Sequence, residues 1–294
     1  MSSDYDIKPV LKWAGGKRNL VPQIREFYKN LKPKKYIEPF FGGGAIYFDI
    51  LKTFGEKFKK TSIINDVNQD LIDMYKNIKT FPDEVIYHLK RLKRDYEKHG
   101  YYFIRAKFNG KNQNGDTVEK YQGIERSAAL ILINKTCFNG LYRVNKNQLF
   151  NVPKGNYKNP KIIDEENLYK VSSVLPKEQN IRCQQFDKIE NINKGDLVYF
   201  DPPYHPLNQT SSFTSYSGAF GKDEQIRLRD YFETLDKKGI YVILSNSSAN
   251  FIKDLYGKFN IQRVHARRFI NSKADKRQGV CEFIILGDHL LKNK

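Results

Sequence analysis

Residues that could build a metal centre or a disulfide framework are scarce in this 294-residue chain. The three cysteines, Cys137, Cys183 and Cys281, are odd in number and widely separated, which argues against paired disulfides and against a zinc site. The five histidines form no closely spaced pair that could serve as metal ligands. We therefore predict that the protein holds no metal and belongs in a reducing compartment.

Long apolar runs are also missing. Stretches such as 240–244 and 283–286 are far shorter than the ~20 residues that a membrane span needs, and residues 1–6 are polar and acidic, unlike a signal peptide. The aromatic content of 14% is nevertheless higher than disordered chains usually carry. These features predict a folded protein of one large or two ordinary domains, without membrane association and located in the cytoplasm.

Acidic residues are outnumbered. The chain has 51 Lys and Arg against 33 Asp and Glu, a net charge of +18 with an isoelectric point near 9.5. Segment 81–160 alone has a net charge of +8, and basic residues gather again in 263–277. A polyanionic partner such as nucleic acid is the natural interpretation. The alternative is an AT-rich genome that enriches lysine on a solvated surface.

Hydrophobic periodicity predicts alternating strands and helices at both ends of the chain and helices between them. We expect strands at 35–40, 62–66, 180–186, 197–200, 240–245, 261–267 and 280–286, and helices at 45–54, 68–78, 81–98, 124–134, 223–235 and 249–256. Segments 107–123 and 145–160 are rich in Gly, Asn or Pro and should form loops. The pattern predicts an α/β fold with an open, largely parallel sheet and an inserted, mainly helical domain.

The motif Asp201-Pro202-Pro203-Tyr204 directly follows the apolar strand 197–200. Ligands of open α/β sheets bind at the carboxyl ends of the strands, so a site is expected there. The motif suits an exocyclic amine, whose lone pair is delocalised into the ring until the nitrogen pyramidalises. Asp201 can accept one N–H and the Pro202 carbonyl the other, while Tyr204 offers an aromatic face to an extruded base. A simple turn formed by the two prolines is the alternative.

Glycines 42–44 lie between the first predicted strand and its helix, where they permit positive φ and close approach of a ligand. Asp66 ends the next strand, at the position where an acidic side chain can bind ribose hydroxyls. A role for Asp66 in capping the following helix remains open. The segment 12–17 is not a Walker loop, because Leu11 replaces the required glycine and Arg18 the required serine or threonine.

Segments 12–17, 38–44 and 199–204 resemble, in this order, the three signature motifs of the Dam-type DNA adenine-N6 methyltransferases. The helical insertion before Asp201 follows the order of the α class of that family. Segments 134–143 and 150–155 look like the family's target-recognition hairpin, and segments 212–216 and 244–247 also match. The resemblance extends over roughly residues 8 to 286.

The resemblance implies a Rossmann-like methyltransferase fold that uses S-adenosylmethionine as cofactor. The catalytic residues would be Asp201, Pro202, Pro203 and Tyr204. The cofactor would be bound by Trp13, Lys17, Glu38, Phe40, Gly42, Gly44, Asp66, Phe186 and Asp201. The alternative for Trp13 is that it is a residue of the hydrophobic core and does not contact the cofactor. Gln185 departs from the family, in which an aspartate commonly precedes the aromatic residue that corresponds to Phe186.

The resemblance further implies that double-stranded DNA is the substrate and that GATC or a near relative is its recognition sequence. The residues expected to contact DNA are Phe138, Asn139, Leu141, Arg143, Lys146, Pro153, Lys154 and Lys158. A planar guanidinium at position 143 suits a guanine edge, whereas the lysines, as compact charges, suit phosphates. A surface Arg143 that contacts only phosphate is the alternative.

Together, these expectations predict a site-specific DNA methyltransferase that modifies adenine N6 by base flipping. We expect residues 1–80 and 178–294 to form the cofactor-binding catalytic domain and residues 81–177 to form the target-recognition domain. The enzyme should be a monomer in solution and be associated with the nucleoid. The sequence leaves open whether it has a companion restriction endonuclease or acts alone in marking DNA. The alternatives are a methyltransferase that acts on RNA or on a protein amide, and a DNA-binding relative without catalysis.

Overall fold

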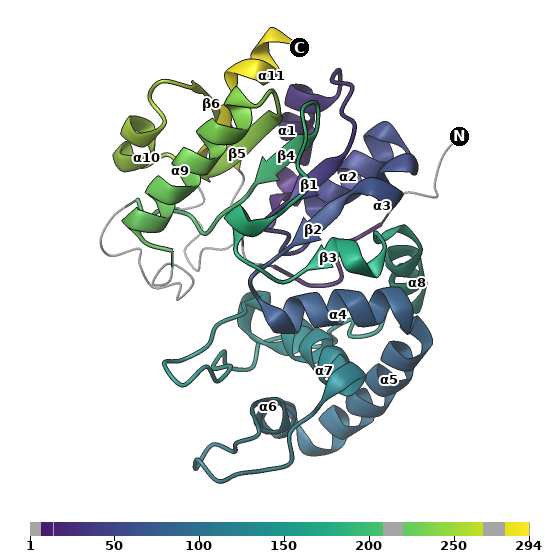
Figure 1. Ribbon diagram of the computed structural model, residues 1–294. Coiled ribbons are helices and arrows are strands. Elements are labelled where there is room, and N and C mark those ends of the chain that lie inside the picture. The colour runs from purple at the N-terminus through teal and green to yellow at the C-terminus, as the bar shows by residue number, and fades with distance from the viewer. Residues whose placement is uncertain (1–6, 14, 208–219, 267–279, 294) are drawn as a thin grey trace. The chain divides into compact units, whose positions relative to one another are not determined.

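The computed structural model describes residues 7–13, 15–207, 220–266 and 280–293, and the chain divides into two compact units (Figure 1). The first unit comprises Met1–Gly16, Gly42–Phe48 and Asp66–Cys183, and the second comprises Lys17–Phe41, Asp49–Asn65 and Gln184–Lys294. The units cross the predicted boundaries at several places, since residues 66–80 belong with the helical unit. The functional division of the chain into catalytic and target-recognition domains stays a prediction.

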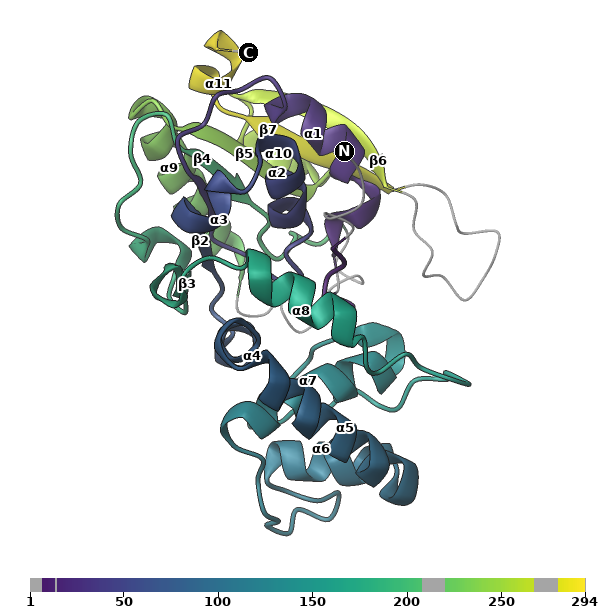
Figure 2. The same ribbon diagram turned by 90° about the vertical axis from the view of Figure 1, so that its right-hand side faces the viewer.

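The sheet has seven strands in the order β3-β2-β1-β4-β5-β7-β6. They are β1 (Tyr36–Glu38), β2 (Ile63–Asn65), β3 (Ile181–Arg182), β4 (Leu197–Phe200), β5 (Tyr241–Ser247), β6 (Asn260–Ala266) and β7 (Val280–Leu286). Strand β1 pairs in parallel with β2 and β4, and β4 pairs in parallel with β5, whereas β7 runs antiparallel to both β5 and β6 (Figure 2). This is a Rossmann-like open sheet closed by an antiparallel pair, as the sequence predicts.

The second unit buries one face of its sheet under helices. Leu228 and Phe232 of α9 and Ile252 of α10 pack in one core with Val198 of β4 and Leu244 of β5. The continuous apolar stretches in β4 and β5 are typical of parallel strands covered on both faces. The helices and 3₁₀ turns in the chain segments of this unit are η1 (Lys17–Asn19), α1 (Val21–Tyr28), α2 (Ala45–Phe54, which begins in the first unit), α3 (Lys57–Thr61), η4 (Phe186–Lys188), α9 (Lys222–Lys237), α10 (Asn250–Leu255) and α11 (Asp288–Lys292).

The first unit is a helical bundle around α7 (Gly123–Thr136). Residues 127–134 of α7 are all buried, so this helix is covered on every side, and it packs against α4, α5 and α6 (Figure 1). The other helices and 3₁₀ turns of the unit are α4 (Gln69–Thr80), α5 (Pro82–His99), α6 (Tyr101–Asn109), η2 (Phe138–Gly140), α8 (Glu165–Val174) and η3 (Glu178–Asn180), and strand β3 also belongs to it. Within the described ranges, no helix is both long and apolar enough to span a membrane.

Several predicted elements differ from the structure. The strand predicted at 180–186 is wrong beyond β3, and Phe186 begins a 3₁₀ turn instead. The buried Asn65 side chain bonds both the N–H and the carbonyl of Gln184 at 3.2 and 2.9 Å, in place of a longer backbone ladder. Helix α6 also extends to Asn109, into the loop predicted from residue 107. Segment 212–216 and the connection 267–277 lie outside the described residues.

Candidate active site

Asp201 follows the carboxyl end of β4, next to the buried Lys17. Lys17 Nζ lies 2.9 Å from Asp201 Oδ1, and its side chain is only 4% exposed. Ser245 of β5 donates a second hydrogen bond to the same oxygen, at 3.1 Å. Because the Ser245 hydroxyl proton is directed at Asp201, Tyr199 must donate the 2.7 Å hydrogen bond that joins it to Ser245. Tyr199 therefore donates its hydrogen bond to Ser245, and Ser245 donates to Asp201.

Two acceptors of this turn, Asp201 Oδ2 and the Pro202 carbonyl, belong to adjacent residues. No described residue donates a hydrogen bond to either of them. The next carbonyl, that of Pro203, already accepts a hydrogen bond from Gln225 Nε2 at 2.9 Å. Two neighbouring acceptors are thus available to an amine with two N–H donors, while the other oxygen of the carboxylate is held in place.

Burial raises the pKa of Asp201, and the nearby Glu282 carboxylate raises it further. The ammonium of Lys17 and the hydroxyl of Ser245 act in the opposite direction, but the pKa stays above its ordinary value. Tyr204 donates a hydrogen bond to Glu282 Oε2 at 2.7 Å, and Lys17 Nζ lies 4.6 Å from the centre of its ring. Burial, Asp201 and Glu282 all raise the pKa of the Tyr204 phenol, so this phenol stays protonated and keeps the ring fixed.

An aromatic cluster lies in the same unit. The Phe40 ring stacks on Phe186 with centroids 5.4 Å apart and contacts Phe220 at 5.6 Å. The Arg227 guanidinium covers Phe186 at 4.7 Å and donates a hydrogen bond to the amide oxygen of Gln185 at 3.2 Å. The unusual Gln185 is therefore engaged by an arginine. Phe40 and Phe186, both predicted to bind the cofactor, are in direct contact.

Glu38, another predicted cofactor residue, is buried at the end of β1. It accepts a hydrogen bond of 2.8 Å from the phenol of Tyr36. Burial raises the pKa of that phenol well above its usual value, and the Glu38 charge raises it further. The proton therefore stays on Tyr36 and orients the Glu38 carboxylate.

In the first unit, the glycine turn is built against Trp13. Gly42 has a φ of +48°, and a Cβ atom on it would lie 2.7 Å from Trp13 Cδ1. A side chain is thus excluded both by backbone conformation and by space. Gly44 also has positive φ, and the Gly42 carbonyl accepts a hydrogen bond of 3.1 Å from Tyr75. Trp13, Gly42 and Gly44 therefore form one packed turn.

Asp66 fixes this turn through its carboxylate. Its Oδ2 accepts a hydrogen bond from Gly42 N and its Oδ1 one from Asn68 N, both at 3.0 Å. Burial raises the pKa of Asp66 and these backbone N–H groups oppose that effect. The side chain that caps α4 is Asn68, which accepts from Leu71 N at 3.1 Å. Asp66 joins the glycine turn to the start of α4 and is not itself the side-chain cap.

The predicted recognition hairpin begins at a tightly packed base. The buried Asn134 side chain bonds Lys12 N at 2.8 Å, Lys12 O at 3.0 Å and Gly140 O at 2.9 Å. A Cβ atom on Gly140 would lie 2.3 Å from Lys12 Cβ, and one on Gly155 would lie 2.7 Å from Cys137 O. Residues 137 and 154 form an antiparallel bridge. Polar bonds and close backbone contacts therefore hold the base rigidly.

Beyond this base the hairpin is exposed. Residues 144 and 150 form a second bridge, and Arg143 Nε donates to Asn151 Oδ1 at 2.7 Å. No described residue bonds the two terminal nitrogens of that guanidinium. Phe138 is 49% exposed. Among the other predicted DNA contacts, the exposed residues are Lys146, Pro153, Lys154 and Lys158, and the half-buried ones are Asn139, Leu141 and Arg143.

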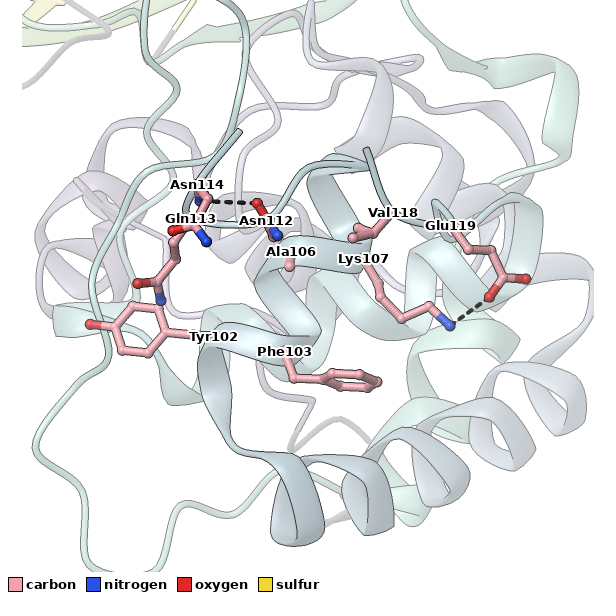
Figure 3. Close-up of a pocket in the computed structure, with 9 residues that line it drawn as sticks. All are labelled: Tyr102, Phe103, Ala106, Lys107, Asn112, Gln113, Asn114, Val118 and Glu119. Atoms are coloured by element: carbon pink, nitrogen blue, oxygen red, sulfur yellow. Dashed lines mark hydrogen bonds and ion pairs between the residues drawn. The ribbon is translucent and has the colours of Figure 1, made fainter. Parts of the chain in front are cut away.

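A separate hollow of about 520 Å³ lies in the first unit between α6 and the following loop (Figure 3). Its lining includes Tyr102, Phe103 and an ion pair of 2.8 Å between Lys107 and Glu119, and none of the predicted site residues. In the described parts of the chain, no cluster of three or more His, Cys, Asp or Glu residues could hold a metal ion.

The comparisons with known proteins establish the family. Residues 13–270 match the family model of the D12 class N6 adenine-specific DNA methyltransferases. The chain is 48% identical to the type II methyltransferase M.MjaIII of Methanocaldococcus jannaschii, covering 96% of this chain and 99% of that protein. It is 39% identical to the type II methyltransferase M1.LlaDCHI of Lactococcus lactis, with 95% of each chain covered. Identity to the DNA adenine methylase of Vibrio cholerae is 34%, again with 95% of each covered.

This chain therefore belongs to the D12 class N6 adenine-specific DNA methyltransferases. It is an enzyme that transfers a methyl group to adenine N6 in DNA, as the resemblance implies. Among solved structures, the rRNA methyltransferase aviRa of Streptomyces viridochromogenes aligns with a TM-score of 0.40 and 11% identity over 99% of this chain and 95% of that chain. That likeness by itself supports no assignment.

The structure adds residues to the site that the motifs do not single out. Glu282 and Gln225 contact the catalytic turn but lie outside the motifs. Tyr199 lies in the third signature segment, which gives no indication of its bond to Ser245. Ser245 is part of segment 244–247, which matches the family, but its sequence position gives no indication of its bond to Asp201. For Ser245 and Glu282, the signal available in the sequence is polar character at positions next to apolar strand residues. Gln225 lies among charged residues of α9 and has no such signal.

Proposed function

We propose that this methyltransferase orients the amine of an extruded adenine with Asp201 and Pro202 and takes its methyl group from S-adenosylmethionine. The observation that carries this proposal is the pair of available acceptors, Asp201 Oδ2 and the Pro202 carbonyl, beside a carboxylate oxygen held by Lys17 and Ser245. Each acceptor takes one N–H of the amine. The nitrogen then pyramidalises, and its lone pair is directed away from the ring.

S-adenosylmethionine, when bound, supplies a methyl group on a positively charged sulfur, and the carbon–sulfur bond breaks as the carbon–nitrogen bond forms. Asp201 accepts the proton that N6 releases, for which its raised pKa suits it. Tyr204, held by Glu282, offers the flipped base an aromatic face. No step requires a metal ion.

The residues around the glycine turn support the proposed cofactor. Gly42 lets the backbone pack directly against Trp13, where a Cβ atom would clash, and the buried Asp66 carboxylate fixes the backbone there. We propose that Trp13, Gly42, Gly44 and Asp66 bind S-adenosylmethionine. Lys17, Glu38, Phe40 and Phe186 of the second unit are further proposed contacts, which rest on the family resemblance.

We propose that the hairpin reads GATC or a near relative in duplex DNA. The guanidinium of Arg143 is oriented by Asn151 through Nε, which leaves two parallel donors for the O6 and N7 atoms of a guanine. Phe138, Asn139, Leu141 and Pro153 are the other proposed base contacts. The exposed Lys146, Lys154 and Lys158 carry charges suited to phosphates.

One experiment tests donor, base and sequence together. The purified protein is incubated with labelled S-adenosylmethionine and duplex DNA in EDTA, and modified adenines are then located by sequencing. We expect N6-methyladenine in GATC or a sequence that differs from it at one base pair. Activity that requires a divalent metal would overturn the proposed chemistry, and methylation at an unrelated sequence would overturn the proposed specificity.

Three further points concern a companion protein, the oligomeric state and the location of the enzyme. The relatives from M. jannaschii and L. lactis carry type II methyltransferase names, which supports the proposal that this enzyme has a companion restriction endonuclease. Cleavage of unmethylated, but not methylated, target DNA by a neighbouring gene product would test it. A monomeric state, testable by light scattering, and a nucleoid-associated location stay predictions.

A further inference from the structure

Two fully buried amide side chains lie behind the catalytic turn, Gln225 in α9 and Asn246 in β5. Gln225 Nε2 donates to the Pro203 carbonyl at 2.9 Å, and Asn246 Nδ2 donates to Gln225 Oε1 at 3.0 Å. Asn246 Oδ1 in turn accepts a hydrogen bond from His205 N at 3.2 Å. The two amides therefore connect the backbone on one side of Tyr204 to the backbone on its other side.

The backbone fixes the direction of every bond in this chain. His205 N can only donate and the Pro203 carbonyl can only accept, so each amide must present its oxygen toward His205 and its NH₂ group toward Pro203. A reversed amide would place two donors or two acceptors face to face. Since buried polar groups without partners are costly, the arrangement has a single satisfied state.

We infer that Gln225 and Asn246 are positioning residues that clamp the catalytic turn from behind and keep the Pro202 carbonyl directed at the substrate amine. Gln225 bonds the Pro203 carbonyl and Asn246 bonds the His205 N–H, so the backbone on both sides of Tyr204 cannot rotate. The Pro202 carbonyl therefore keeps its direction toward the base amine. Together with the bond from Tyr204 to Glu282, it holds the turn at three points. The inference rests on the proposed role of Asp201 and Pro202.

A clamp and simple core packing predict different results for two substitutions of similar size. Gln225→Met fills the space but offers no donor to Pro203. Gln225→Glu has no donor for Pro203 when the new carboxyl group is ionised, and the oxygen that replaces Nε2 then repels the Pro203 carbonyl. When protonated, the same carboxyl group donates to Pro203 and accepts from Asn246, which restores both bonds.

The test measures kcat for methyl transfer to duplex DNA at saturating S-adenosylmethionine between about pH 6 and pH 9, the range over which a buried glutamate can titrate. We expect Gln225→Met to reduce kcat by about 10- to 100-fold at every pH, because small displacements of reacting groups have effects of that size. Gln225→Glu should be more active than Gln225→Met, and its kcat relative to the parent should rise as the pH falls. KM for DNA should change little in either variant.

The ionisable groups Asp201, Glu282 and His205 near the turn are common to the parent and the variant, so their effect on the pH dependence largely cancels in the ratio of the two kcat values. Gln179→Glu, at an exposed position in η3, introduces the same charge away from the site and should leave kcat unchanged at all pH values. Thermal unfolding of each variant shows whether it is folded at the assay temperature.

Two results would overturn the clamp. One is a kcat for Gln225→Met within about threefold of the parent, a change of under 1 kcal/mol. The other is a Gln225→Glu variant as slow as Gln225→Met at every pH, which would assign the loss to packing alone. Either result, with an active parent that depends on Asp201, leaves the proposed function intact. An Asp201→Ala variant that retains activity would instead remove the proposed function itself.

Discussion

The turn after β4 and the hairpin after α7 place their polar groups in opposite environments. At the turn, Lys17 is 4% exposed and bonded to Asp201, and Gln225 is fully buried. On the hairpin, Phe138 is 49% exposed, and Lys146 and Lys154 point into solvent. The charges of the turn are paired within the protein, whereas the lysine charges of the hairpin are exposed to solvent.

This difference follows from what each region has to do. A group that directs one lone pair must be held in one orientation in a site from which water is largely excluded, where electrostatic interactions are strong. A surface that binds DNA must instead expose charged groups for the phosphates and hydrogen-bonding groups for the base edges, and these groups stay in water until the DNA binds. The rigid base at Asn134 and Gly155 shows that the hairpin is fixed where it leaves the bundle and exposed only beyond that point.

The largest effect is expected from Asp201→Ala. Loss of the carboxylate should reduce kcat by about 10²- to 10⁴-fold, the usual range for a group that handles a proton in the transition state. DNA binding, which belongs to the other region, should be nearly unchanged in a gel-shift titration. The control is Asp254→Ala at an exposed position of α10. Retention of more than a few per cent of the parent rate would contradict the role of Asp201.

The second effect concerns specificity. Arg143→Ala should lose about 1 to 3 kcal/mol of discrimination at one guanine, so that methylation of a variant sequence approaches that of the target. Lys154→Ala should weaken binding to all sequences alike and lower the slope of log K against log salt by about one. The two variants act as controls for each other on a panel of single-base substitutions. A uniform loss in both would mean that Arg143 reads no base.

Asp66→Ala should have a smaller effect, on cofactor affinity. It removes the hydrogen bonds that hold the backbone of Gly42 and Asn68. Because these bonds hold the turn in the free and in the bound protein alike, we expect a loss of about 1 kcal/mol in cofactor binding, the net value of one hydrogen bond. We expect weaker binding of S-adenosylmethionine by calorimetry. Asn68→Ala, which removes the cap of α4 and leaves the Asp66 carboxylate in place, provides the comparison. An unchanged dissociation constant in Asp66→Ala would exclude Asp66 from the cofactor site.

The smallest predicted effect is a shift in pH dependence. Lys17 lowers the pKa of Asp201, so its removal in Lys17→Met should raise that pKa further. The carboxylate would then become protonated at a higher pH as the solution is acidified. The acid limb of kcat, measured with saturating cofactor, should move to higher pH. Lys17→Arg keeps the charge and should move it less. A limb that stays in place would show that Asp201 is not the group being titrated.

The sequence by itself determined the elements whose signals are local. Residues 197–200 are a short apolar run ended by two prolines, and they form β4 followed by the catalytic turn. Residues 45–54 form α2 with the predicted bounds, directly after the glycines that need positive φ. Helices α6 and α8 were not predicted, because short helices depend on packing against neighbours more than on their own periodicity.

The tertiary structure alone decided which groups surround the reacting atoms. Lys17 and Ser245 are separated from Asp201 by more than forty residues on either side, yet both bond the same carboxylate oxygen. Gln225 and Asn246 likewise meet only because α9 packs on the sheet beside β5. The motif determines where the catalytic carboxylate lies along the chain. Its charge state and the direction of its free oxygen depend on partners that only the packing of distant strands and helices brings within hydrogen-bonding distance.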